Sequence, residues 1–170
     1  MAIDRSEPST TAPERAMLDG WLDYHRATLE MKCEGLTADQ LRDRSVPPSS
    51  LSLLGLVRHL AEVERYWFRN IFRGEPAAPH FYTDEKPNDD FDDLESVEPE
   101  QAFATWRAEC ERAREICTEA SLDDISNEKN QRTGESFSLR WIVTHMIEEY
   151  ARHNGHADLI REAIDGSTGD

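Results

Sequence analysis

The segment from Ser138 to Ile164 constrains the fold of this chain more than any other. Apolar side chains recur along it at steps of three and four residues, and the serine at its start can cap a helix. The pattern predicts one long amphipathic helix, and such a helix buries its apolar face against other helices. That face carries Ile142, Met146, Tyr150, Ala157, Ile160 and Ile164.

The same segment carries four polar residues that can bind metals: His145, Glu149, His153 and His156. At about 100° per residue, with His145 at zero, His156 lies near ~20°, Glu149 near ~40° and His153 near ~80°. Glu149 and His153 therefore fall at or inside the edge of the buried face. A carboxylate there is costly unless it is paired, hydrogen-bonded or bound to a metal. We interpret His145 and His156 as residues at the rim.

Three earlier stretches also predict amphipathic helices, each with its own start or stop signal. Ser50 or Ser52 can cap the second of them. A separate capping box, Thr37-Ala-Asp-Gln40, predicts a short helical turn. The first long helix opens at the capping box Thr11-Ala-Pro-Glu14 and ends at Gly35, the second runs from about Leu53 to Phe72 before Gly74, and the third runs from about Pro99 to Ala120.

These stretches predict an all-α protein, a four-helix bundle with a long crossover between its second and third helices. Residues 121–137 read as a polar connector with a small turn at Thr133-Gly-Glu, and no stretch convincingly predicts a strand. We expect residues 1–10 to form a disordered leader and residues 11–166 to form a single domain. The crossover, residues 75–98, is rich in proline and acidic residues. We interpret it as a solvated connection, because its aspartates lack the calcium-binding EF-hand pattern.

Composition excludes several partners and compartments. The formal net charge is −16 and no block of Lys and Arg is present, which argues against binding to nucleic acid or to an anionic membrane. No apolar run approaches the roughly 20 residues of a membrane span, and the first residues do not resemble a signal peptide, so we expect a cytoplasmic protein. The three cysteines lack the spacing of a disulfide framework or a zinc knuckle.

A second buried histidine suggests a metal site between helices. His59 shares a helix face with Leu56, Val63 and Tyr66. Together with Glu149 and His153 it would supply two imidazoles and one carboxylate and leave coordination positions open, as a catalytic metal requires. The alternative is a hydrogen-bonded packing role for His59 and an ordinary side-chain pair four residues apart on the last helix. Spacing alone leaves both interpretations open.

The sequence resembles the DinB-like superfamily over nearly its whole length after the leader. The resemblance rests on Leu53-Leu-Gly-Leu-Val-Arg-His59-Leu-Ala-Glu-Val-Glu-Arg-Tyr-Trp-Phe, on Lys32-Cys-Glu-Gly-Leu-Thr and on Glu149-Tyr-Ala-Arg-His153-Asn-Gly-His156-Ala-Asp. It implies a four-helix bundle with a long crossover, frequently dimeric. It also implies a divalent metal held by one histidine on the second helix and by two ligands four residues apart on the fourth.

Carried onto this chain, the implied metal ligands are His59, Glu149 and His153. Many members of the superfamily have His-x-x-x-His followed by Gly-Gln, whereas here a glutamate takes the first ligand position and His156 takes the glutamine position. The glutamate parallels the mycothiol-dependent maleylpyruvate isomerase branch. The change makes His156 a candidate for a fourth ligand or for a group that supports a ligand. Tyr66, Trp67 and Tyr150, one helical step from the ligands, are candidates for a pocket wall or, as the alternative, for packing in the core.

The characterised relatives implied by this resemblance are isomerases and S-transferases that use mycothiol or bacillithiol. The resemblance therefore implies a metal-dependent thiol S-transferase or thiol-assisted isomerase that acts on small electrophiles, with mycothiol as co-substrate, and a homodimer. Zinc is the favoured metal, with nickel, iron and manganese as alternatives. Two other classes stay open: a metal- or ligand-binding stress protein without turnover, and a metal-dependent hydrolase.

Overall fold

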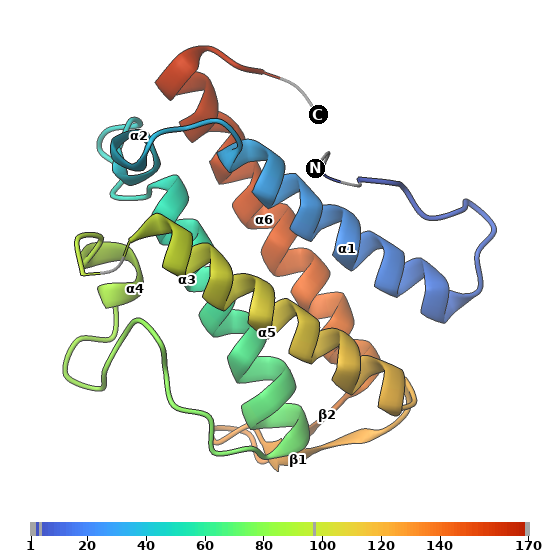
Figure 1. The fold of residues 1–170 in the computed structure, drawn as a ribbon. Coiled ribbons are helices and arrows are strands. Elements are labelled where there is room, and N and C mark those ends of the chain that lie inside the picture. The colour runs from blue at the N-terminus through green and yellow to red at the C-terminus, as the bar shows by residue number, and fades with distance from the viewer. Residues whose placement is uncertain (1–2, 4, 97, 169–170) are drawn as a thin grey trace.

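A computed structural model describes residues 3, 5–96 and 98–168, and over these residues the protein is mostly helical, as predicted. Long helices lie lengthwise beside one another, and a small sheet closes one end (Figure 1). The bounds are α1 Glu14–Cys33, α2 Ala38–Arg42, α3 Leu53–Glu64, η1 Arg65–Arg73, α4 Asp89–Asp92, α5 Pro99–Glu119, β1 Ile125–Lys129, β2 Ser136–Ser138 and α6 Leu139–Asp165. Among the described residues no helix is long and apolar enough to cross a membrane.

Most of the predicted capping residues and terminal glycines lie at the helix ends where they were expected. The hydroxyl of Ser52 accepts a hydrogen bond from the backbone N–H of Gly55 at 3.1 Å, which caps α3. Ser138 caps α6 in the same way through the N–H of Trp141. Helix α2 begins with the predicted capping box. Glycines in the left-handed conformation follow η1 and α6, where an L side chain would be strained: Gly74 has φ 68° and Gly166 has φ 77°.

The capping box predicted at Thr11 is wrong. Helix α1 begins at Glu14, and Pro13, in an extended conformation with ψ 153°, occupies the capping position. Thr11 lies two residues before that capping position, and no side-chain hydrogen bond caps α1. The predicted leader includes residues 1, 2 and 4, which lie outside the described residues; nearby, Arg5 contacts the Tyr24 ring. Disorder of this leader stays a prediction.

The expectation of a strand-free connector is also wrong. Strands β1 and β2 form an antiparallel pair in which Ile125 faces Ser138 and Lys129 faces Ser136, with an irregularity between these positions. The pair was hard to predict because β1 is short and mostly exposed, which leaves no clear alternation of apolar and polar residues. The expected turn is present at its tip, where Gly134 has φ 73°.

The second long helix changes its winding after Glu64. It continues without a break, but residues 65–73 form the wider π-helical segment η1. A wider turn advances each side chain by a smaller angle, so a helical wheel drawn from His59 at α-helical spacing fails beyond this point. Tyr66, which that wheel placed on the face of His59, is 43% exposed.

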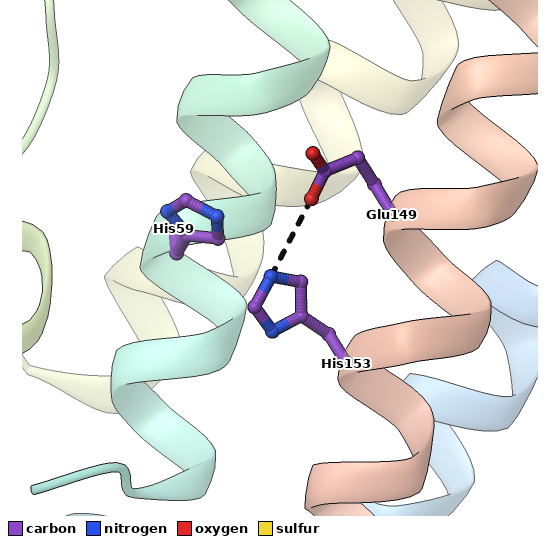
Figure 2. Close-up of side chains that lie close together, drawn as sticks. All are labelled: His59, Glu149 and His153. Atoms are coloured by element: carbon purple, nitrogen blue, oxygen red, sulfur yellow. Dashed lines mark ion pairs between the residues drawn. The ribbon is translucent and has the colours of Figure 1, made fainter.

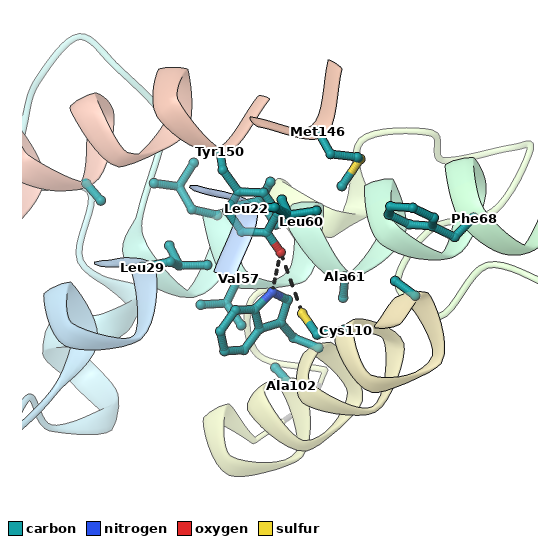
Figure 3. Close-up of a cluster of buried hydrophobic side chains, with 14 of the residues drawn as sticks. Leu22, Leu29, Val57, Leu60, Ala61, Phe68, Ala102, Cys110, Met146 and Tyr150 are labelled. Atoms are coloured by element: carbon teal, nitrogen blue, oxygen red, sulfur yellow. Dashed lines mark hydrogen bonds between the residues drawn. The ribbon is translucent and has the colours of Figure 1, made fainter. Parts of the chain in front are cut away.

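Buried polar side chains connect the long helices inside the apolar core (Figure 3). Arg26 on α1 donates two hydrogen bonds to the carboxylate of Glu64, at 2.7 and 2.8 Å. The Tyr150 hydroxyl on α6 donates to Glu64 at 2.8 Å and accepts from the indole N–H of Trp106 on α5 at 2.8 Å. Glu64 is 0% exposed and Arg26 is 4% exposed. Burial raises the pKa of Tyr150 well above its usual range, so its hydroxyl stays protonated and able to donate.

The crossover between η1 and α5 is anchored on α3 and η1 by buried charged side chains. Glu62 accepts the backbone N–H groups of His80 and Phe81, both at 2.6 Å, and pairs with Arg65 at 2.7 Å. Arg58 donates to the carbonyl of Asp89 at 2.8 Å. Residues 83–88 are exposed, as expected of a solvated connection, but Phe81, Asp90 and Leu94 are buried. The interpretation as a solvated connection therefore holds for residues 83–88 but not for the buried residues on either side of them.

Glu64→Gln should destabilise the protein by about 3–5 kcal/mol, because it removes the buried counter-charge of the Arg26 guanidinium and leaves only the pair with the partly exposed Asp23. Urea unfolding followed by circular dichroism measures the change. Glu14→Gln, which makes the same chemical change in the exposed pair with Arg140, is the control and should alter stability little. Equal effects of the two substitutions would contradict the structural role of the buried pair.

Candidate metal centre

The three predicted ligands come together between α3 and α6. These helices run antiparallel, and His59 projects from α3 toward Glu149 and His153 on α6 (Figure 2). One potential ligand atom from each of the three residues lies within 4.8 Å of the others. His59 and Glu149 are partly exposed and His153 is buried, so the cluster lies at the surface edge of the core.

Glu149 lies between two imidazoles of its own helix. One of its carboxylate oxygens is 3.5 Å from Nε2 of His153, and the other is 3.5 Å from Nε2 of His145. The hydrogen bond with His153 lowers the pKa of Glu149 against the opposing effect of partial burial, and positive charge on the neighbouring histidines adds to this. The carboxylate is therefore ionised at neutral pH, which is the form that binds a metal.

The donor set fits a divalent metal. At the usual bond lengths of about 2.0–2.1 Å, two ligand atoms on a tetrahedral zinc lie roughly 3.3 Å apart. The distance of 3.5 Å between the Glu149 carboxylate oxygen and Nε2 of His153 is close to that value. Two neutral imidazoles and a carboxylate also suit nickel, iron or manganese, and three protein ligands leave at least one position open.

A second group of side chains that could hold a metal shares one residue with the first. His145, Glu148 and Glu149 also place ligand atoms within 4.8 Å of one another. All three lie on α6, and the side chain of Glu148 is 59% exposed, whereas the first group joins two helices. His145 was expected at the rim, and its ring packs between Trp67 and Trp141.

His156 contacts the predicted ligand His153 on the side away from Glu149. Its Nδ1 lies 3.3 Å from Nδ1 of His153, the ring nitrogen opposite the one that faces Glu149. Partial burial lowers the pKa of His156, and positive charge on His153 and Arg152 lowers it further. Of the two predicted roles, this contact favours support of His153 over direct ligation.

The three residues considered for a pocket wall lie differently around this cluster. Tyr150 is fully buried and points into the core, where it bonds to Glu64 and Trp106, so core packing is the role observed for it. This agrees with its place on the apolar face of the helical wheel. Tyr66 is exposed and packs edge-on against Trp67. Trp67 itself contacts the His145 ring at 4.8 Å between centroids.

Two further aromatic residues, which were not predicted from the sequence, pack against Trp67. Trp141 and Phe137 pack on Trp67 at centroid distances of 5.2 and 5.1 Å, and Trp141 also stacks on the His145 ring. Trp141 is four residues before His145, so helical spacing alone could have placed it there.

A residue of the crossover also reaches the cluster. The carboxylate of Asp90 lies 2.9 Å from Nδ1 of His59, and the neighbouring Phe91 ring stacks on the His59 ring at 4.7 Å. Asp90 stands among many acidic residues in the crossover, and no periodic pattern distinguishes it from them.

None of the cysteines offers a nucleophile at this site. Cys33, Cys110 and Cys117 are buried free thiols. Burial raises the pKa of Cys33 and of Cys117 to about 12, and it raises the pKa of Cys110 as well. Since the thiolate is the reactive form, any sulfur chemistry at this site needs a thiol from solution.

We therefore expect the folded protein to resist thiol reagents. At neutral pH a chromogenic disulfide reagent should label no cysteine within minutes, and the same protein in denaturant should react at all of its cysteines. Rapid labelling of the native protein would contradict the burial and the raised pKa values of these thiols.

The lowered pKa of Glu149 links stability to pH. The ordinary pKa of this group is 4.5 and the folded value is lower, so its contribution is present above pH ~4.5 and is lost as the pH falls through the folded pKa. Glu149→Gln removes this contribution. In metal-free protein, the unfolding free energy of the variant should fall less steeply than that of the wild type between about pH 5 and pH 3. Urea titrations across this range measure both slopes, and equal slopes would contradict the expectation.

Two imidazoles and a carboxylate on facing helices form the kind of site with which helical proteins hold a divalent metal. A family model described as mycothiol-S-transferase matches residues 17–166. The chain belongs to the mycothiol S-transferase family, and the resemblance to the DinB-like superfamily is confirmed. A comparison with curated proteins finds no match.

Proposed function

We propose that this protein is a divalent-metal-dependent thiol S-transferase, or a thiol-assisted isomerase, that joins mycothiol to small electrophiles. The observation that carries the proposal is the convergence of His59, Glu149 and His153 within 4.8 Å in a member of the mycothiol S-transferase family. The buried, protonated cysteines add support, because the protein has no accessible sulfur of its own at this site.

His59, Glu149 and His153 would hold the metal. When bound, a divalent cation supplies Lewis acidity that lowers the pKa of a thiol next to it. The ionised Glu149 offsets part of the cation's charge, while the two imidazoles act as neutral donors. Zinc is the metal we favour for this donor set, and nickel, iron and manganese fit the same ligands.

The residues around the site suit the transfer step. The thiol gives up its proton to solvent, its sulfur forms a bond to carbon of the electrophile, and the leaving group departs with the electrons of the broken bond. In an isomerisation the thiol is instead released again and recovers a proton. The rings of Trp67, Trp141 and Phe137 beside His145 offer apolar surface that can hold an electrophile and exclude water.

The framework we infer for this activity is a DinB-type four-helix bundle with a long crossover. Its long helices are α1, α3 with η1, α5 and α6, and residues 11–166 would form one domain after a disordered leader, residues 1–10. We propose a cytoplasmic homodimer that acts on a small molecule and a low-molecular-weight thiol. The net charge of −16 supports the absence of nucleic acid among its partners.

Metal analysis tests the site directly. We expect purified protein to bind about one divalent ion per chain after incubation with zinc, nickel or manganese. His153→Ala should lose this ion while its circular dichroism spectrum is retained. His80→Ala is the matched control, since His80 pairs with Glu109 and is not a proposed ligand. Wild-type protein that binds no metal would contradict the proposal, and metal retained by His153→Ala would point to His145, Glu148 and Glu149 instead.

Activity assays separate the remaining classes. With a chromogenic electrophile such as chlorodinitrobenzene, we expect metal-loaded protein to form the conjugate with mycothiol faster than with glutathione, and His59→Ala to lose most of that rate. Product formed without any thiol would favour a hydrolase. Bound metal without turnover across a panel of electrophiles would favour the binding protein without catalysis.

A further inference from the structure

Asp90 makes an unusual contact for a residue of a surface crossover. It is 6% exposed, although the residues just before it are in water. One carboxylate oxygen lies 2.9 Å from Nδ1 of His59, and the other accepts the backbone N–H of Phe91 at 3.1 Å. Burying a carboxylate is costly unless partners of this kind satisfy it.

This contact sets the state of the His59 ring. An ionised carboxylate only accepts hydrogen bonds, so the proton of His59 resides on Nδ1 when the two groups bond. The other ring nitrogen, Nε2, then carries a free lone pair. In Figure 2 one ring nitrogen of His59 points toward Glu149 and His153, while the other points away from them. The bond to Asp90 thus prepares the nitrogen that faces the other two ligands.

The crossover holds Asp90 firmly against α3. The guanidinium of Arg58, the residue before His59, donates to the carbonyl oxygens of Asp89 and Asp93. These two bonds anchor the first residue of α4 and the residue that follows it. On the same helix, the absence of a side chain at Gly55 makes room for Phe91. A Cβ there would lie 3.2 Å from the Phe91 ring, which stacks on His59 with an interplanar angle of 30°.

We propose that Asp90 is a positioning residue that fixes the tautomer and orientation of His59 for metal binding. Residues 89–93 then belong functionally to the metal centre, and the packing of the crossover sets the metal affinity. Carboxylates that hold a ligating histidine in this way change metal affinity by roughly 10–100-fold when they are removed. This inference rests on the metal site of the proposed function, but it makes no assumption about the reaction.

Metal affinity measured by competition with a chromogenic zinc chelator tests the inference. Asp90→Ala should bind zinc about 10–100-fold more weakly than the wild type. Asp90→Asn keeps an oxygen that accepts from Nδ1 but loses the charge, so its loss should be smaller. Asp92→Asn is the matched control, because the side chain of Asp92 lies on the same short helix and is 59% exposed beside Arg44. It should stay within about twofold of the wild type.

A readout without metal separates positioning from a merely structural role. Nitrogen-15 NMR of the metal-free protein at pH 8 should show His59 with its proton on Nδ1 in the wild type and in Asp90→Asn. In Asp90→Ala the proton should move largely to Nε2, while the melting temperature reports whether the fold is retained. If Asp90→Ala does not fold, Asp90→Asn carries the affinity test against Asp92→Asn.

The outcomes distinguish this inference from the proposed function. Unchanged zinc affinity in Asp90→Ala and Asp90→Asn, or an unchanged His59 tautomer in a folded Asp90→Ala, would overturn the role of Asp90. Wild-type protein that binds zinc but transfers no thiol would refute only the transferase. Wild-type protein that binds no zinc would refute both the metal site and the role of Asp90 in it.

Discussion

The buried ion pair between Arg26 and Glu64 is the interaction on which the arrangement of the helices depends. Through the Tyr150 hydroxyl, the same carboxylate also connects α3 to α6, and Trp106 extends the connection to α5. Tyr150 directly follows Glu149, so the bond that points into the core fixes the height of α6 against α3. The proposed metal ligands on the outer side of this contact between helices therefore meet because the polar side chains on its inner side are paired.

Helix α3 and its continuation η1 also use buried charge to organise the crossover. Arg58 and Glu62 bond mainly to backbone groups of residues 80–93, and Arg65 donates to the carbonyl of Ala77. Bonds from a rigid helix to a backbone specify a path for the chain with little regard to the side chains along it. These bonds do not depend on the side chains of the exposed residues 83–88, and they hold Asp90 next to His59.

Features that depend on local spacing could be predicted from the sequence. Caps such as Ser52 and Ser138 act over a few residues, and the four-residue step from Glu149 to His153 brings two side chains together on any helix. The position of His59 opposite Glu149 and His153 was predicted from the resemblance as well as from helical periodicity. The place of Asp90 beside His59 could not be predicted, because it depends on tertiary packing, whereas the burial of Tyr150 follows from its position on the apolar face of the last helix. The π-helical segment after Glu64 and the polar hairpin have no strong periodic signal.

The burial of the cysteines has a consequence for the proposed transfer of a thiol to electrophiles. A reactive compound captured at the His59, Glu149 and His153 cluster finds no thiolate of the protein within reach, because Cys33, Cys110 and Cys117 are buried and protonated. A transferase of the proposed kind would therefore resist alkylation by its own substrates. In the proposed reaction the low-molecular-weight thiol would be consumed in place of the protein's cysteines.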